Sequence, residues 1–255
     1  MQIHFDVKIS KGYHSASQKS RVLSEAWVGN EVFCPNCGSN LLQFNNGKPV
    51  ADFYCSICRE EYELKSKKDS MGMKIVDGAY RTMLERLTSY NNPSLFLLNY
   101  DLQNYKIQNF FVVPKHFFVP EIIEKRKPLS ETARRAGWVG CNILLKNIPL
   151  TGKIFYVRDG KVELRENILK YWSKTLFLRE TKELAAKGWI LDIMNCIDKI
   201  GKGEFSLNEV YAFEMLLKQK YPNNRHIRDK IRQQLQFLRD KGYLDFIARG
   251  NYRLR

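Results

Sequence analysis

Residues 51–68, ADFYCSICREEYELKSKK, bring together side chains that can bind metals and stabilise negative charge. The stretch contains two cysteines, one aspartate, three glutamates and three lysines. Thiolates bind zinc, carboxylates bind hard cations such as magnesium, and a lysine can stabilise a developing anion. The same composition would also suit a strand whose charges are merely solvated. Spacing, more than composition, distinguishes these two interpretations.

Two Cys-x-x-Cys pairs, at residues 34–37 and 55–58, are separated by seventeen residues. Each pair can form a tight knuckle that presents two sulfurs to one ion, so the spacing predicts a closed structural zinc site. Free core cysteines and a thioredoxin-like redox pair are the alternatives, and direct nucleic-acid contact by a zinc ribbon stays open. Cys141 and Cys196 lack partners at useful spacing and are expected in the core. The expected zinc ligands are Cys34, Cys37, Cys55 and Cys58.

Glu63-Leu64-Lys65 fits the acid-x-Lys half of a metal-dependent nuclease signature, a pattern that also occurs at Asp6, Asp159 and Glu180. Geometry favours the first match. If the second cysteine knuckle turns an antiparallel hairpin, positions whose numbers sum to 115 lie opposite one another.

That register places Asp52 opposite Glu63 and Val50 opposite Lys65. On the other face, an apolar set pairs residue 53 with 62 and 51 with 64. Like charges placed directly opposite are destabilising, so a cation between the two carboxylates would explain their positions. The alternative is a solvated strand face.

In the nuclease interpretation, we expect Asp52 and Glu63, with Leu64, to bind magnesium. The ion would lower the pKa of a water and neutralise charge on the scissile phosphate. Lys65 would orient that water and stabilise developing charge. Glu25 either adds a further ligand or is simply solvated. The expected catalytic residues are Asp52, Glu63 and Lys65.

The composition of the chain predicts a globular protein with a polyanionic partner. Its 255 residues are 44% hydrophobic, and 42 Lys and Arg against 27 Asp and Glu give a net charge of +15. Such a charge favours nucleic acid or an anionic membrane surface. No apolar run is long enough to span a membrane, and the start lacks a signal-peptide core. We therefore expect a monomer of the prokaryotic cytosol, without membrane or small-molecule cofactor.

Residues 1–182 have the pattern of a mixed α/β domain. Residues 1–9 suggest a strand, residues 15–28 a helix, and residues 77–90 another helix. Short apolar runs at SLFLLNY and QNFFVVP predict strands buried on both faces. The segment KIFYVRDGKVEL predicts a hairpin turning at Asp159-Gly160.

Residues 183–255 show a different order, with three helices followed by a hairpin, which is the order of a winged helix. The second helix, SLNEVYAFEMLLKQKY, begins with a serine cap three residues before Glu209. The third carries a buried stripe at Ile227, Ile231, Leu235 and Leu238. The final YLDFIARGNYRLR alternates around a Gly-Asn turn.

Residues 221–255 carry nine Lys or Arg and three Asp, and this charge predicts DNA contact by the third helix and the wing. Arg and Gln are side chains that bind guanine and adenine edges. The alternative is an ordinary amphipathic helix of a protein–protein module. Trp138 is expected to be buried or to wedge against a base. The expected DNA-contacting residues are Arg225, Arg228, Arg232, Gln233, Gln236, Arg249, Asn251, Arg253 and Trp138.

Several longer strings, spread over essentially the whole chain, carry a resemblance to a known family. These include CPNCG, VADFYC, EYELKSKK, DGAY, RKPL, TARRAGW, GCNI, NCIDKI, KIRQQLQ, LRDKGYL and RGNYR. In these strings and their order the sequence resembles the DpnI restriction endonuclease family. An alanine, Ala51, precedes Asp52 where the wider nuclease superfamily often has a proline.

The resemblance implies a PD-(D/E)XK nuclease domain with a zinc site, followed by a winged helix. It further implies magnesium-dependent cleavage of double-stranded DNA at GATC sites whose adenine carries a methyl group on its exocyclic amine. Asp52, Glu63 and Lys65 match the family's catalytic motif, and the four paired cysteines match its zinc ligands. The main alternative is a zinc-ribbon and winged-helix DNA-binding regulator without catalytic activity. A repair nuclease with the same fold is a third possibility.

Overall fold

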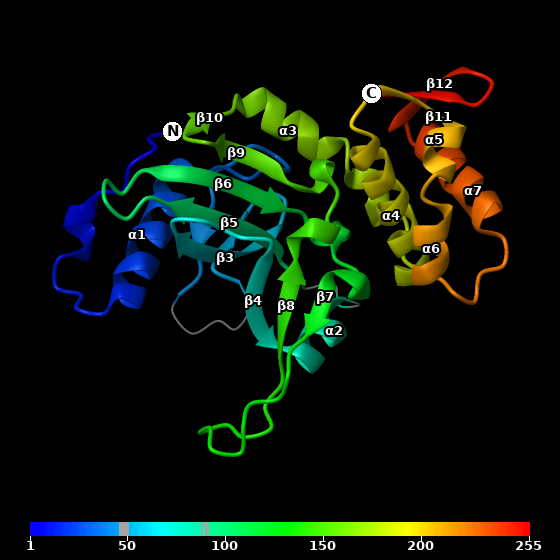
Figure 1. Ribbon diagram of the computed structural model, residues 1–255. Helices are drawn as coiled ribbons and strands as arrows, with labels where there is room; N and C mark the ends of the chain where they lie inside the picture. Colours follow the sequence, from blue (N-terminus) through cyan, green and yellow to red (C-terminus); the bar gives the residue numbers. More distant parts are fainter. Residues whose placement is uncertain (46–50, 88, 90–91) are drawn as a thin grey trace.

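The computed structural model describes residues 1–45, 51–87, 89 and 92–255, and its centre is a seven-stranded sheet (Figure 1). The sheet is mixed: β3 and β5 run parallel, and the other neighbouring strands run antiparallel. In spatial order its strands are β1 (Leu42–Gln43), β2 (Phe53–Tyr54), β3 (Glu61–Lys68), β5 (Ser94–Tyr100), β6 (Ile107–Val113), β9 (Ile154–Arg158) and β10 (Lys161–Val162).

The middle of this sheet is buried on both faces, as the apolar runs predicted. Every residue of β5 is buried, and on β6 Phe110 and Phe111 point into different clusters of the core. Such central strands read as continuous apolar runs because neither face meets water. The hairpin β9–β10 turns at Asp159-Gly160 as predicted, with both turn residues at positive φ.

Helices α1 (Ala16–Glu31) and α3 (Arg165–Ser173) cover one face of the sheet. Their side chains Leu23, Trp27 and Trp172 share a core cluster with Phe53 and Tyr62 of the sheet. Trp27 makes both an apolar and a polar contact. Its ring packs in the core, and its indole N–H donates to the Gln2 carbonyl at 2.8 Å. This layer supports the strands that carry the charged residues of interest.

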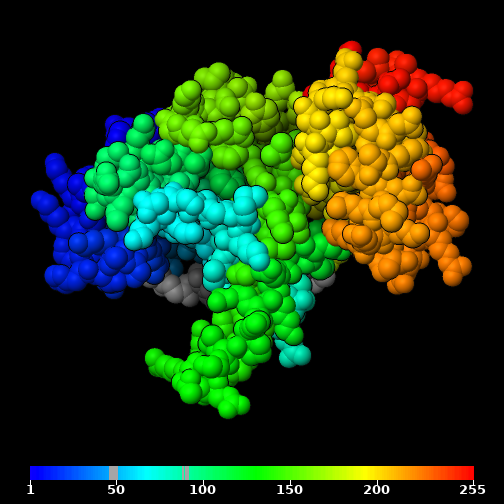
Figure 2. Space-filling view, in the orientation of Figure 1, coloured from blue at the N-terminus to red at the C-terminus, as the bar shows by residue number. Residues whose placement is uncertain are grey.

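A second, three-stranded sheet lies on the other face. Its order is β4 (Lys74–Ala79), β8 (Gly140–Leu144) and β7 (Ile123–Lys125), and α2 (Tyr80–Leu87) follows β4 directly. The connection between β7 and β8, residues 126–139, projects from the body of the protein as a long arm (Figures 1 and 2). The arm carries Lys127, Arg134 and Arg135 at exposed positions and Arg126 at a partly buried one.

The C-terminal part contains the predicted helices and hairpin, together with a short strand that the sequence did not predict. Its strands form a sheet in the order β11, β13, β12. Ser206 caps α5 through the reciprocal contacts of a capping box with Glu209. The elements are α4 (Leu184–Ile200), β11 (Glu204–Ser206), α5 (Leu207–Tyr211), α6 (Glu214–Lys220), α7 (Ile227–Asp240), β12 (Leu244–Ala248) and β13 (Asn251–Leu254).

One core cluster runs through both parts of the chain. It joins Leu97 and Phe111 of the first part to Met194, Ile231 and other residues of the C-terminal helices. Cys141 and Cys196 are buried in this cluster, which confirms the prediction that they are core residues. No helix within the described ranges is long and apolar enough to cross a membrane.

Several boundary predictions were wrong. The expected strand at residues 1–9 is reduced to a single bridge at His4 and a 3-10 helix at Val7–Ser10. The Asp6 side chain accepts a hydrogen bond from the Lys8 N–H, which favours this turn over an extended strand. The expected second helix of the winged domain divides into α5 and α6, and the terminal hairpin turns at Arg249-Gly250 instead of Gly-Asn.

Candidate metal centres and nucleic-acid interface

The two cysteine pairs converge on one point. All four Sγ atoms lie within 4.8 Å of one another, and the Cys34–Cys58 and Cys37–Cys55 sulfur distances are both 3.4 Å. Zinc–sulfur bonds of about 2.3 Å in a tetrahedron place sulfurs about 3.8 Å apart, so the cluster has the size that zinc requires. The four cysteines therefore could hold a zinc ion with no open ligand position.

Each knuckle is formed by local backbone geometry. The Cys34 carbonyl accepts from the Gly38 N–H at 2.8 Å, and the Cys55 carbonyl accepts from the Arg59 N–H at 2.9 Å. Gly38 and Arg59 have positive φ angles of 80° and 61°, which turn the chain sharply after each pair. Burial opposes ionisation of Cys37, but hydrogen bonds from Ser39 lower its pKa to about 7. A thiol that loses its proton near neutral pH is suited to binding a metal.

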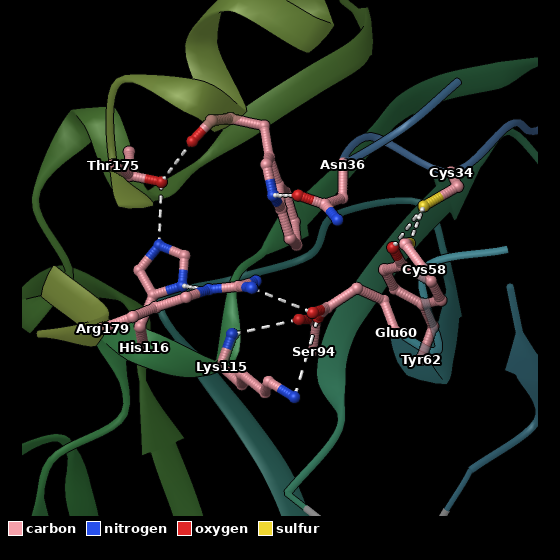
Figure 3. A network of polar contacts seen from close by, with 11 residues as sticks. Cys34, Asn36, Cys58, Glu60, Tyr62, Ser94, Lys115, His116, Thr175 and Arg179 are labelled. Atoms are coloured by element: carbon pink, nitrogen blue, oxygen red, sulfur yellow. Dashed lines mark hydrogen bonds and ion pairs between the residues drawn. The ribbon is translucent and has the colours of Figure 1, made fainter. Parts of the chain in front are cut away.

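The first cysteine knuckle also contacts β3 and α3 (Figure 3). The Tyr62 hydroxyl lies 3.1 Å from Cys34 Sγ, and the Trp172 indole donates to the Asn36 side chain at 2.9 Å. Because Asn36 lies within the first knuckle, α3 is held against the metal centre.

A buried ionic network extends from the second knuckle. Glu60, only 5% exposed, accepts an ion pair from Arg179 at 3.0 Å and lies 3.8 Å from the Lys115 ammonium (Figure 3). The Arg179 Nε donates to His116 Nδ1 at 3.3 Å, and His116 Nε2 lies 2.8 Å from the Thr175 hydroxyl. Arg179 ends the 3-10 helix Leu176–Arg179, four residues before α4 begins with its cap. The network thus connects the cysteine cluster to the domain junction.

The carboxylate register agrees with the predicted hairpin. Phe53 is opposite Tyr62 and Tyr54 is opposite Glu61, so paired positions sum to 115. The apolar face is buried as predicted, with Phe53 and Tyr62 fully covered. The expected pairing of Val50 with Lys65 lies outside the described residues.

The charged face of the hairpin holds Asp52 and Glu63 beside Lys65. The Leu64 N–H donates to the Asp52 carboxylate at 2.6 Å, which fixes the position of Asp52 next to the motif. The Lys65 ammonium lies 2.5 Å from a Glu63 oxygen. The structure therefore brings all of the predicted catalytic residues to one place.

Asp77 is a further member of this cluster, and sequence reasoning did not assign it. Its carboxylate lies 2.9 Å from the Lys65 ammonium, and its side chain is 6% exposed. The sequence predicted that Asp77 begins a helix. In the structure Asp77 lies on β4, and the helix that follows this strand, α2, begins only at Tyr80. The string DGAY, one of those that carry the family resemblance, was the available signal, but it does not indicate a contact with β3.

Electrostatics in the cluster favour an additional cation. Burial raises the pKa of Glu63, and the neighbouring Asp77 and Asp52 raise it further, although Lys65 opposes them. For Lys65, burial is outweighed by the charges of Glu63 and Asp77, which raise its pKa and keep it protonated. Glu63 and Asp77 contact the ammonium, and Asp52 lies near Glu63. These three carboxylates leave an excess of negative charge, and their oxygens are ligands that magnesium prefers.

The carboxylates are less compactly arranged than the cysteines. Among residues 1–45, 51–87, 89 and 92–255, only the four cysteines form a group of three or more potential ligands within 4.8 Å. Glu25, considered as a further ligand, is paired with Arg21 at 2.6 Å and accepts from Gln43 at 3.0 Å. Its partners hold it at the edge of the hairpin.

The predicted DNA-contacting residues of the C-terminal domain lie at exposed positions, on the outer face of α7, just before it, or on the β12–β13 hairpin. Three arginines already have partners. Arg228 pairs with Glu214 at 2.7 Å, Arg253 with Glu204 at 2.8 Å, and Arg232 donates to the Tyr211 hydroxyl at 2.9 Å. These pairs are exposed, so water and salt screen them and DNA phosphates can compete.

Trp138 is separate from these residues, on the arm between β7 and β8 (Figure 1). It is partly buried, and the Arg135 guanidinium lies 4.6 Å from its ring centroid. The structure therefore does not bring Trp138 together with α7 and the wing. Its ring lies against Gly140 instead, and Gly140 pairs with Ala79 of β4, two residues after Asp77.

A mixed α/β domain with a four-cysteine cluster, joined to a winged-helix domain, defines a class of DNA-binding proteins. Comparison with known families agrees: residues 1–181 match the model of the DpnI (Dam-replacing) family, and residues 185–254 match that of the Dam-replacing HTH domain. The chain belongs to the Dam-replacing (DpnI) family of restriction endonucleases.

Proposed function

We propose that the protein is a magnesium-dependent, methyl-directed DNA endonuclease with a nuclease site of the PD-(D/E)XK type. The observation that carries the proposal is that Glu63 and Asp77 both contact the Lys65 ammonium, while Asp52 is held beside them by the Leu64 N–H. A solvated strand would not require a partly buried lysine held by two carboxylates. Family membership supports the same reaction class.

Asp52 and Glu63, with Leu64, would hold the magnesium ion, which when bound acidifies a water molecule and neutralises charge on the phosphate. The Leu64 N–H would keep Asp52 oriented toward the ion. Lys65 would hold a water or phosphate oxygen with its ammonium group, which its acidic neighbours keep charged. The zinc cluster would have a structural part, because it closes the hairpin that sets Asp52 opposite Glu63.

The substrate we propose is double-stranded DNA that carries N6-methyladenine, with G-methylA-TC as the site. The winged-helix domain would contact the duplex through Arg232, Gln233 and Gln236 of α7 and through Arg225 just before it, among the residues named above. The arm with Trp138 would meet the DNA close to the cleavage site, since β4 and β8 connect it to Asp77. We further propose that the protein acts in the cytoplasm as a monomer.

A plasmid assay tests this proposal. Adenine-methylated and unmethylated plasmids are incubated with the protein, with and without magnesium, and nicked and linear products are quantified. We expect cleavage only of the methylated plasmid and only with magnesium. Glu63→Gln should lower cleavage by about 100-fold or more. Glu166→Gln, at an exposed position on α3, is the matched control and should cleave normally.

A DNA-binding regulator without catalytic activity is the second candidate function, favoured by the zinc cluster and the winged helix alone. It would bind methylated DNA without nicking it under any of these conditions. It leaves the contacts of Lys65 with Glu63 and Asp77 without a role. Equal cleavage of both plasmids would instead indicate a nuclease that does not depend on methylation.

A further inference from the structure

A cavity of about 950 Å³ lies between the first domain and the C-terminal domain. One wall is the β9–β10 hairpin, a second is formed by α3 and the following 3-10 helix, and a third by residues 241–243 and the end of β13. None of the candidate metal ligands or DNA-contacting residues lines it. Small-molecule sites of 300 to about 1,000 Å³ are often found at such domain junctions.

The cavity has an excess of positive charge. Of its six lining cations, three already have partners within the protein: Lys241 pairs with Glu180, Arg255 with Asp245, and Lys174 with a backbone carbonyl. The other three make no ion pair with any described residue: Lys153, Arg158 and Lys161.

Two of these cations face each other across the hairpin. Arg158 and Lys161 are direct partners in the β9–β10 register. Like charges opposite one another destabilise a strand pair unless an anion lies between them. The nearby Glu163 Oε1 accepts from Asn167 and the Leu164 N–H, both at 2.8 Å, and Glu163 forms no ion pair with Arg158. The lining contains six cations against three carboxylates, those of Asp159, Glu163 and Asp198. The excess of positive charge at the hairpin therefore favours an anionic ligand.

The cavity also offers groups that suit a planar ring and hydroxyls. Tyr171 is 43% exposed, and its ring stacks on no other aromatic ring of the described residues. The Thr151 and Tyr243 hydroxyl oxygens are buried and lack a well-formed hydrogen bond, although the two lie near enough to interact with each other. Buried hydroxyls are normally satisfied, so a ligand atom would complete them.

We propose that this cavity binds a free nucleotide, with its phosphate against Lys153, Arg158 and Lys161. The base stacks on Tyr171, and the sugar or base hydrogen-bonds to Thr151 and Tyr243. Burial raises the pKa of Tyr243 to about 12, so its hydroxyl keeps a proton to donate. Because both domains line the cavity, the ligand stabilises their docking.

The test measures binding of AMP, ATP, adenosine and inorganic phosphate to the full-length protein by calorimetry, in buffer without magnesium. AMP or ATP should bind saturably, and adenosine and phosphate more weakly. The double variant Arg158→Ala/Lys161→Ala should weaken AMP binding by about tenfold or more, because charge-assisted hydrogen bonds are lost. Tyr171→Ala should weaken AMP binding and leave phosphate binding unchanged. Lys146→Ala, exposed and outside the cavity, is the control for nonspecific charge effects.

Thermal unfolding without ligand gives a second readout. A purely structural role of the two cations predicts that the double variant unfolds at a lower temperature. The proposal predicts an unchanged or higher unfolding temperature, since repulsion is removed, together with loss of the increase that AMP causes in the wild type. Absence of saturable nucleotide binding, or equal weakening by Lys146→Ala, would overturn the proposal. A short DNA duplex is also tested. If it displaces AMP, and if the double variant weakens its binding, the cavity binds the DNA backbone and the proposal is overturned.

Discussion

The Asp77 carboxylate lies 2.9 Å from the Lys65 ammonium, although the two residues belong to different sheets. Lys65 is on β3 of the large sheet, and Asp77 is on β4 of the small one. The contact therefore joins the two sheets at the candidate nuclease site. It also holds the lysine at a fixed position beside Glu63.

Asp77→Asn should lower cleavage by about 10- to 100-fold, because it removes the charge that orients Lys65 without removing a proposed metal ligand. Single-turnover cleavage of a methylated duplex provides the measurement. We expect the cleavage rate to fall while the affinity for DNA stays within twofold of the wild type.

The matched control for this variant is Asp101→Asn. The Asp101 side chain lies in an exposed turn, where it accepts from the Gln103 N–H, and it makes no ion pair with Lys65. If Asp77→Asn cleaves at the wild-type rate, Asp77 does not position Lys65. If it lowers only stability, its contribution is structural, which urea unfolding of the same samples would reveal.

Removal of zinc should abolish both the native fold of the hairpin and cleavage. The four cysteines close the turn that pairs Phe53 with Tyr62, next to Asp52 and Glu63, and the metal would hold the two knuckles together. The protein is treated with a chelator, and zinc content, circular dichroism and cleavage are measured. Readdition of magnesium alone should not restore cleavage, whereas zinc followed by magnesium should. Full recovery with magnesium alone would show that the two centres are independent.

Arg179→Met should destabilise the protein by about 3 kcal/mol, because the Glu60 carboxylate stays buried after losing its 3.0 Å partner. Urea unfolding with zinc present measures this change. The double variant Glu60→Gln/Arg179→Met should recover part of the loss, since neither charge is then left alone. Additive effects of the two substitutions would mean that the ion pair contributes nothing to stability.

Stability should fall as the pH drops below about 6.5, in part because of His116. Burial lowers the pKa of His116 well below its usual value, and the charges of Arg179, Lys187 and Lys115 lower it further. The folded imidazole thus stays neutral while the unfolded one takes up a proton, so acid favours the unfolded state with a limiting slope of about 1.4 kcal/mol per pH unit. His116→Gln should reduce this slope between pH 7 and pH 5. An identical slope in the variant would contradict the assignment.

Arg249→Ala, on the β12–β13 turn, should weaken DNA binding about equally for all sequences and reduce the dependence of affinity on salt by about one phosphate contact. Gln236→Ala, on the exposed face of α7, should instead reduce the preference for the proposed site. Fluorescence anisotropy at several salt concentrations measures both effects. A loss of sequence preference in Arg249→Ala would mean that the wing contacts bases.

The sequence by itself determined the local features of this protein. The spacing of the cysteines predicted their cluster, and the turn that they enclose predicted the register of Phe53 with Tyr62, because the side-chain period of a strand is two. Continuous apolar runs predicted the buried β5 and β6 for the same local reason. At the N-terminus, however, a hydrogen bond from the Lys8 N–H to the Asp6 side chain competed with the expected strand, and periodicity could not reveal it.

Only the tertiary structure decided which distant segments meet. The contact of Asp77 with Lys65 depends on how the small sheet packs on the large one, and the pairing of Glu60 with Arg179 joins residues 119 positions apart in the sequence. The cavity between the domains likewise combines residues from 150 to 255. Such contacts arise when whole faces of secondary structure are buried against one another, and the spacing of residues within a single element carries no information about that packing.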